Sequence, residues 1–565
     1  MCVKKAMISI VVVCTLLLTL ICFHQCYIKK EGDSTTLLLL DTKTNRIELL
    51  NTSATKLTED TVIKKFVNGE VVEASLSDLY IGMNNLYVKT NGDVIETILI
   101  DNEPIFNRLR VAIRKSLSNL GKSGLYHDTV IVEFSSDTKI KTFDGEKEWK
   151  VSSGDSIEFY VNNNEITFKI GNKVNSSSKR IIIEEGTSPL KITSITRNSN
   201  LLYEGKLDLS LVNEKILVVN DILMEDYLKK VVPSEMISSW NMEALKAQAI
   251  AARTFAYKAI YNKSYRASGY VVDDSTNDQV YNNISEQTRT NQAVLDTKGL
   301  VMFYNNKPIT AYFYSGDGGL RGNANEVWIT NKVTSDIPYL HGGNETNMSV
   351  DVTNESSVLN FYKTINMTAT GGASSNFRWL VTMNKQQLRQ TLNANVPSSG
   401  SKSFPILENG SWLTKAFPSD IGTISNIFVS ERGSSGVVVS VQVVAANVTF
   451  RVYGQSNLRS TFAPGDCGSS VTTYYTKANT TTYDYSSTSV SSLKSGYFAL
   501  EWNGDNLSFY GGGSGHGVGL SQYGANYYAN QGQSYTQILN RYYTGVTYVD
   551  TFKEYTPLRN YKDYL

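Results

Sequence analysis

Two residues stand in surroundings that suit chemistry: a glutamate among apolar side chains and a histidine among glycines. Glu235 follows Val231 and Val232 and precedes Met236 and Trp240. Such neighbours withdraw water from a carboxyl, raise its pKa and leave a proton available for general acid catalysis. The structural alternative, a surface glutamate near a helix start, is the commoner case for a carboxylate.

His516 lies in the segment GGGSGHGVG (511–519). Glycines let the backbone approach a ligand closely while a single polar ring is presented to it. A flexible surface loop with an incidental histidine explains the segment equally well. Ser521 and Gln522 follow and can hydrogen-bond a ligand, although a helix N-cap also explains Ser521.

Serine and metal chemistry find less support in the sequence. The segment SGDGG (315–319) offers Ser315 as a nucleophile, but the motif Gly-x-Ser-x-Gly is absent. Four of the five cysteines stand at or before position 26, and Cys467 is alone in the remainder. We therefore expect no disulfide beyond the N-terminal segment, no structural zinc site and no cofactor.

Composition limits the function classes. The 565 residues are 41% hydrophobic and 19% charged, which is typical of a folded globular chain of three or four domains. The net charge of +1 gives no long-range attraction to nucleic acid. We expect no nucleic-acid partner.

An uncharged run spans positions 6–28 between two lysine pairs. A helix of that length is just able to cross a bilayer core of about 30 Å. A cleaved signal peptide is the alternative, but no small-residue cleavage site follows the apolar stretch. The run predicts an uncleaved single-pass membrane anchor over 1–33, with the bulk of the chain on the outer side of the cytoplasmic membrane.

The remainder predicts an α+β fold that is strand-rich, with one central amphipathic helix and short C-terminal helices. Alternating residues predict strands over 36–40, 46–50, 86–89, 94–100, 129–134, 156–161, 165–170, 180–184 and 216–219. Helical periodicity predicts helices over 221–230 and 241–262, the second with Asn241 as its N-cap.

Strand character returns over 299–303, 308–314, 424–430 and 437–443. Residues 341–425 are polar and are interpreted as an elaboration of the main region, with one helical stretch near 385–392. Two short helices end the chain, and a capping box of Ser534 and Gln537 precedes the last of them. We divide the chain into the anchor, a small β module of unknown role (34–105), a main region (106–548) and a tail (549–565).

Three motifs in the main region together resemble the stage II sporulation protein D and amidase-enhancer family of bacterial cell-wall proteins. They are VVPSEM (231–236) with EALKAQAIAART (243–254), YFYSGDGG (312–319) with EVW (326–328), and GHGVGLSQYGA (515–525). The resemblance covers 106–548. One departure is that Leu320 and Arg321 stand where the family commonly has a hydroxyl residue.

This resemblance implies that the chain is a peptidoglycan lytic transglycosylase with Glu235 as its catalytic residue. The substrate's own C6 hydroxyl attacks the anomeric carbon, so one glutamate gives a proton and takes one, and 1,6-anhydro-N-acetylmuramic acid forms. Contacts to the glycan strand are implied for His516, Gln522, Ser521, Ser315 and Arg253. Some family members bind zinc through Cys and His, but this chain lacks the cysteines.

Two alternatives remain open. One is hydrolysis, which needs a second carboxylate. Asp273, Asp274 and Glu326 are candidates for it, although the sequence favours a role for each as a turn former or a solvated charge. The other alternative is a non-catalytic glycan-binding protein that enhances a separate cell-wall amidase.

Overall fold

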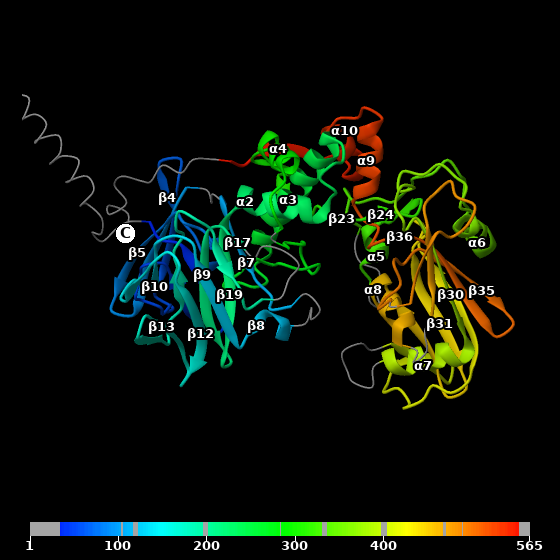
Figure 1. Cartoon of the computed structure of the whole chain (residues 1–565), viewed down its shortest axis with the longest axis horizontal. Helices are drawn as coiled ribbons and strands as arrows, with labels where there is room; N and C mark the ends of the chain where they lie inside the picture. The colour runs from blue at the N-terminus through cyan, green and yellow to red at the C-terminus, as the bar shows by residue number, and fades with distance from the viewer. Residues whose placement is uncertain are drawn as a thin grey trace, which may run out of the picture. The chain divides into compact units, whose positions relative to one another are not determined.

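The computed structural model describes residues 34–102, 106–116, 122–195, 202–282, 284–329, 336–396, 404–466, 471–488, 490–552 and 565. The chain is α+β and strand-rich with several short helices, as predicted (Figure 1). It forms two compact units: unit 1 is Met1–Met224, Ala259–Gln279 and Phe552–Leu565, and unit 2 is Glu225–Lys258 and Val280–Thr551. The predicted anchor lies outside the described residues. Within the part of the chain that is described, no helix is long and apolar enough to cross a membrane.

Unit 1 is built from β-sheets. The first part holds the pair β1 (Leu37–Asp41) and β2 (Arg46–Leu49), and the sheet β3 (Val62–Val67), β4 (Glu70–Glu73), β5 (Leu86–Asn91) and β6 (Val94–Asp101). An eight-stranded sheet contains β7 (Arg108–Ala112), β8 (Tyr126–His127), β10 (Thr138–Thr142), β11 (Glu148–Val151), β15 (Ile181–Ile183), β18 (Lys206–Val212), β19 (Lys215–Leu223) and β20 (Val272–Asp273). A six-stranded sheet contains β9 (Thr129–Phe134), β12 (Ser156–Asn162), β13 (Glu165–Ile170), β14 (Lys173–Ser177), β16 (Leu190–Ile192) and β17 (Leu202–Tyr203). In β9 every second side chain is buried, the alternation that predicted the strand.

Buried ion pairs tie the predicted small β module to the sheets that follow it. Arg180 on the loop before β15 donates from Nε to Glu48 on β2 at 2.5 Å and from Nη1 to Asp208 at 2.8 Å. Arg110 on β7 pairs with the same Asp208. These four side chains are buried, and the predicted module lies within unit 1 together with the sheets that follow it.

Unit 2 contains the helices. They are α2 (Met224–Glu235), α3 (Met242–Asn262), α4 (Thr288–Asp296), α5 (Ala324–Val327), α6 (Glu355–Lys363), α7 (Lys385–Asn395), α8 (Gln455–Thr461), α9 (Gln522–Asn530) and α10 (Tyr535–Tyr542). The first residue of α2 and the last turn of α3 belong to unit 1. Figure 1 shows α9 and α10 beside α3, and Tyr535 N–H donates to Glu243 Oε2 at 2.8 Å across that contact.

The sheets of unit 2 come from distant parts of the chain. The largest contains β24 (Gly316–Asp317), β27 (Arg378–Asn384), β33 (Thr473–Thr476), β34 (Tyr485–Ser487), β35 (Phe498–Asn503) and β36 (Asn506–Ser514). A five-stranded sheet contains β28 (Pro405–Glu408), β29 (Ser411–Thr414), β30 (Ile424–Arg432), β31 (Val438–Ala445) and β32 (Thr449–Tyr453). Smaller groups are β21 (Leu300–Tyr304), β22 (Lys307–Pro308) and β38 (Thr547–Asp550), the pair β23 (Phe313–Tyr314) and β37 (Leu520–Ser521), and the pair β25 (Leu320–Arg321) and β26 (Gly343–Asn344).

Several predicted element types or boundaries are wrong. Residues 221–223 remain in β19 because that strand pairs with β7 as far as Leu223, so α2 begins later than predicted and ends at Glu235. The helix α3 is buried on nearly all sides rather than amphipathic, because its many alanines allow close packing around it. The polar stretch 341–425 supplies β27, a central strand of the largest sheet.

Candidate active site around Glu235

Glu235 is the last residue of α2, and each of its carboxylate oxygens accepts one hydrogen bond. The backbone N–H of Val280 donates to Oε1 at 2.9 Å, and the side-chain amide of Gln522 donates from Nε2 to Oε2 at 3.1 Å. Burial raises the pKa of Glu235 above its ordinary value of 4.5, and the two donors only partly oppose this rise. The residue as a whole is partly exposed, whereas its carboxyl group is largely buried, which is why its pKa is raised.

The segment that follows Glu235 is held from two helices. Arg289 on α4 donates from Nη2 to the carbonyl of Trp240 at 2.8 Å. Asn526 on α9 accepts from the backbone N–H of Asn241 at 3.0 Å. Asn241 Oδ1 accepts from Glu243 N–H at 3.1 Å, which is the predicted N-cap. The position of Glu235 is therefore fixed on both sides, by the end of α2 and by this anchored loop.

Gln522 reaches Glu235 because it is the first residue of α9. Ser521 is the N-cap, and its hydroxyl oxygen accepts from Gly524 N–H at 3.2 Å. The same hydroxyl donates to Asp317 Oδ2 at 2.7 Å. Ser521 is fully buried and positions the start of α9. Its substrate contact stays a prediction.

Two further buried carboxyls, those of Asp317 and Glu345, lie behind Ser521. Asp317 and Glu345 are 1% and 4% exposed, and the hydroxyl of Thr370 lies 3.1 Å from Asp317 Oδ2 and 3.4 Å from Glu345 Oε2. Tyr528 donates to Glu345 at 2.8 Å. Burial raises the pKa of both carboxyls, and the charge of Asp317 adds to the rise for Glu345. These groups form a buried network that supports α9.

Both ring nitrogens of His516 are hydrogen-bonded to the backbone. Nδ1 accepts from Val518 N–H at 3.1 Å, so Nε2 carries the proton and donates to the carbonyl of Phe313 at 2.9 Å. The ring lies 5.0 Å from that of Trp328. The neighbouring Gly517 has a φ of +79°, and a Cβ there would lie 2.4 Å from the ring of Tyr497. Both ring nitrogens thus bind backbone in this structure, and the substrate contact of His516 stays a prediction.

His516→Ala is expected to lower the free energy of unfolding by about 2–4 kcal/mol, because two hydrogen bonds and a packed ring are lost. Burial lowers the pKa of His516 to about 4. An unfolded histidine titrates near 6.5, so the stabilisation is complete above pH 6.5 and is lost as the pH falls toward 4. Urea unfolding between pH 4 and 7.5 measures both effects. His341→Ala, at an exposed ring, is the control, and equal stability of the two variants contradicts the assignment.

The donors of Arg253 are engaged within the fold, and Ser315 is held through its backbone, so their substrate contacts stay predictions. Arg253 is 1% exposed and binds both carboxylate oxygens of Glu225, at 2.9 and 2.7 Å. Its remaining donors reach Thr297 and two backbone carbonyls. This arginine holds α2 against α3. The carbonyl of Ser315 accepts from Tyr523 N–H at 3.0 Å, which fixes the first turn of α9.

The three carboxylates considered as a second catalytic group are engaged elsewhere. Asp273 pairs with Arg114 at 2.7 Å, and Asp274 accepts from the backbone N–H of Arg114. Both belong to unit 1, whereas Glu235 belongs to unit 2. Glu326 accepts from the backbone and hydroxyl groups of Ser434 and Ser435. Although burial opposes it, these donors lower the pKa of Glu326.

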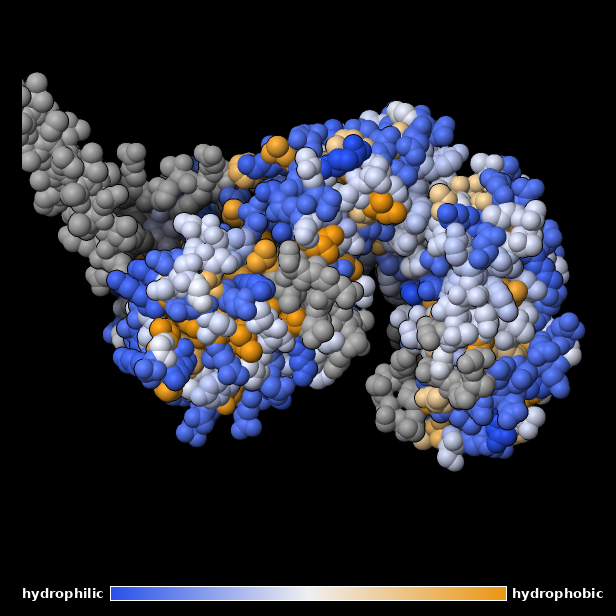
Figure 2. Space-filling view, in the orientation of Figure 1, coloured by the Kyte–Doolittle hydropathy of each residue, from blue (hydrophilic) through white to orange (hydrophobic). Residues whose placement is uncertain are grey.

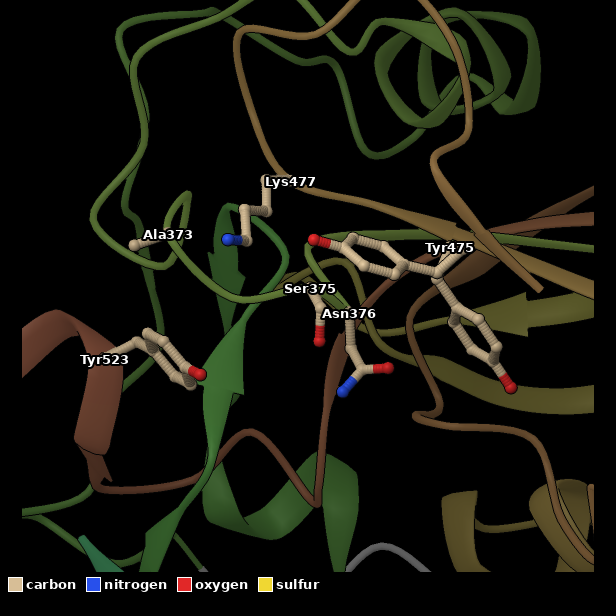
Figure 3. Close-up of a pocket in the computed structure, with 7 residues that line it drawn as sticks. Ala373, Ser375, Asn376, Tyr475, Lys477 and Tyr523 are labelled. Carbon is tan, nitrogen blue, oxygen red and sulfur yellow. The ribbon is translucent and has the colours of Figure 1, made fainter. Parts of the chain in front are cut away.

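Two parts of the site were not predicted from the sequence. One is the backbone N–H of Val280, which a pattern of side chains cannot indicate. The other part is a polar cavity of about 400 Å³ (Figure 3), which is lined by Ala373, Ser375, Asn376, Tyr475, Lys477, Tyr485 and Tyr523. The cluster of tyrosines over 474–485 was the available signal. Among the described residues no group of three or more His, Cys, Asp or Glu side chains is arranged to hold a metal ion.

The fold and site define a class: an α+β protein in which the last residue of a helix, Glu235, holds a carboxyl of raised pKa near a polar cavity. Residues 212–304 match the family model described as Stage II sporulation protein (SpoIID). The chain therefore carries a domain of this family, as the motifs predicted. The match contains Glu235 and the helices α2, α3 and α4.

Relatives agree with the family match. The chain is 30% identical over 337 residues to the amidase enhancer of Bacillus subtilis, an alignment that covers 57% of this chain and 40% of that protein. It is 27% identical over 341 residues to the stage II sporulation protein D of the same organism, covering 58% and 74%. The chain thus spans about two fifths of the length of the amidase enhancer.

Proposed function

We propose that unit 2 cleaves the glycan strands of peptidoglycan by lytic transglycosylation, with Glu235 as acid and then base. The observation that carries this proposal is the carboxyl of Glu235, which is held by Val280 and Gln522 and whose pKa is raised by burial. A raised pKa keeps the proton that the leaving oxygen needs.

The reaction balances with this one carboxyl. Glu235 gives its proton to the glycosidic oxygen as the bond to C1 of N-acetylmuramic acid breaks. The C6 hydroxyl of the same sugar forms a bond to C1, and its proton passes to Glu235. The glutamate is then protonated again, and no water is consumed.

Gln522 suits both forms of Glu235. Its amide donates to the carboxylate, and after rotation about its last bond it accepts from the protonated acid. The engagement of Asp273, Asp274 and Glu326 by other groups also favours a route with one carboxyl over hydrolysis with two.

The name of one relative, amidase enhancer, favours a second candidate function. In that case the same site holds glycan without cutting it and increases the action of a separate N-acetylmuramoyl-L-alanine amidase. The partner would then be a cell-wall amidase.

Purified peptidoglycan incubated with the full chain and no amidase separates the two functions. Transglycosylation is expected to release fragments ending in 1,6-anhydro-N-acetylmuramic acid, each lighter by one water than a hydrolytic product. Liquid chromatography with mass spectrometry measures them. Fragments without the anhydro end would indicate hydrolysis, and release only when an amidase is added would favour the enhancer.

A further inference from the structure

The cavity of Figure 3, named here the Tyr523–Tyr475 groove, is built by three segments of unit 2. One side is Tyr523 on α9. The other side is the hairpin of β33 and β34, in which Tyr475 and Tyr485 are paired in register. Residues 373–376 lie between them. The volume of about 400 Å³ is in the range of small-ligand sites.

The groove adjoins the carboxyl of Glu235 through α9. Gln522 binds Glu235, and the next residue, Tyr523, lines the groove. The ring of Tyr523 also lies 4.8 Å from that of Trp240, on the loop that follows Glu235. A ligand that extends away from Glu235 past this aromatic pair therefore enters the groove.

The chemistry of the lining favours a polar ligand with a negative charge. None of the seven lining residues carries a carboxyl, and within the described part of the chain Lys477 forms no ion pair. Figure 3 shows the polar ends of Lys477, Ser375 and Asn376 turned into the space between Tyr523 and Tyr475.

Tyr475 forms part of the wall of the groove and is 6% exposed. The ammonium of Lys494 lies 5.3 Å from the same ring and adds positive charge. Figure 2 shows that the visible face of unit 2 is mostly polar, with scattered apolar residues.

We propose that the Tyr523–Tyr475 groove binds the continuation of an acidic amino-sugar strand, with Lys477 facing a carboxylate of that strand. This inference rests on the proposed function, because it extends the site at Glu235. The phenols, Ser375 and Asn376 bind sugar hydroxyl and amide groups. The carboxylate belongs either to the lactyl ether of the sugar or to an attached stem peptide.

Binding to the full chain carrying Glu235→Gln, with and without Lys477→Gln, tests the groove without relying on cleavage. The probes are glycan strands without stem peptides, strands with stem peptides, and a neutral chito-oligosaccharide. Lys477→Gln is expected to weaken binding of the acidic strands about tenfold at low salt, since a charge-assisted hydrogen bond is lost. Affinity for the neutral oligosaccharide should change less than twofold. Isothermal titration calorimetry measures each affinity.

The acidic probe that loses affinity identifies the source of the carboxylate. Lys307→Gln, at another exposed lysine of unit 2, is the matched control and should leave all affinities unchanged. Three results would each overturn the proposed binding role of the groove. They are equal affinities with and without Lys477→Gln, an equal loss of affinity for the neutral probe, and no binding of any probe. Cleavage by the chain with native Glu235 is measured separately, so failure of the groove and failure of the proposed function are distinguishable.

Discussion

Glu235→Gln is expected to reduce glycan cleavage by at least about a thousandfold, because acid catalysis alone contributes about 10² to 10⁴ and the same group also serves as base. Glutamine keeps the size of the side chain and loses the transferable proton. Release of anhydro-ended fragments measures the activity. In the native chain the rate should fall as the pH rises through the raised pKa of Glu235, since the deprotonated form cannot donate.

The control for this variant is Glu326→Gln, at a carboxylate that anchors the loop of Ser434 and Ser435. It should keep most of the activity and lose some stability. Binding of the Glu235→Gln chain to glycan should persist, which excludes misfolding as the cause of inactivity. An active Glu235→Gln chain would falsify the assignment of this residue.

Asp317→Ala is expected to lower the free energy of unfolding by about 2–5 kcal/mol, because the hydroxyls of Ser521 and Thr370 lose a buried acceptor. Loss of this support shifts the start of α9 and with it Gln522. A displacement of about 1 Å can cost a hundredfold in rate. We expect kcat to fall more than KM rises. Thermal unfolding and steady-state cleavage measure the two effects.

Two further variants separate the charge of Asp317 from its hydrogen bonds. Asp317→Asn removes the charge, and Ser521→Ala removes the hydroxyl that donates to Asp317. Asparagine keeps an acceptor for the Gly319 N–H and should retain most of the stability. Burial raises the pKa of Asp317, so the native carboxyl contributes most stability below its ordinary pKa and loses that contribution as the pH rises through the raised value. The cost of Asp317→Asn should therefore shrink with rising pH. A stable, fully active Asp317→Ala chain would show that α9 does not depend on this network.

Local patterns predicted the sheets of unit 1 because their alternation is a property of neighbouring residues. The strands β9 and β13 have the predicted bounds. The helix α6 was missed because its sequence, ESSVLNFYK, is polar and short, and its burial against β35 and β36 comes from residues more than 130 positions away. The start of α2 was misplaced because pairing of β19 with β7, a tertiary contact, extends the strand.

Features of the candidate site that depend on neighbouring residues in the sequence were predicted. Features that depend on contacts between distant residues were missed. The apolar neighbours of Glu235 correctly indicated the direction of its pKa shift. The glycines around His516 gave no sign of its contacts with the carbonyl of Phe313 and the ring of Trp328, which lie about 200 positions earlier. Likewise, nothing in the sequence joins residues 373–376 to Tyr523, because they meet only in the folded chain.

The position of Glu235 at the end of α2 has an electrostatic consequence. The peptide dipoles of a helix sum to about half a negative charge at its C-terminal end, which disfavours a carboxylate there by about 0.3–1 kcal/mol. Pro233 lies in this last turn and lacks the N–H that would bind the carbonyl of Lys229. Burial and the helix dipole therefore act on Glu235 in the same direction, and both favour its protonated form. In the proposed reaction this bias favours return of the C6 proton to the carboxylate.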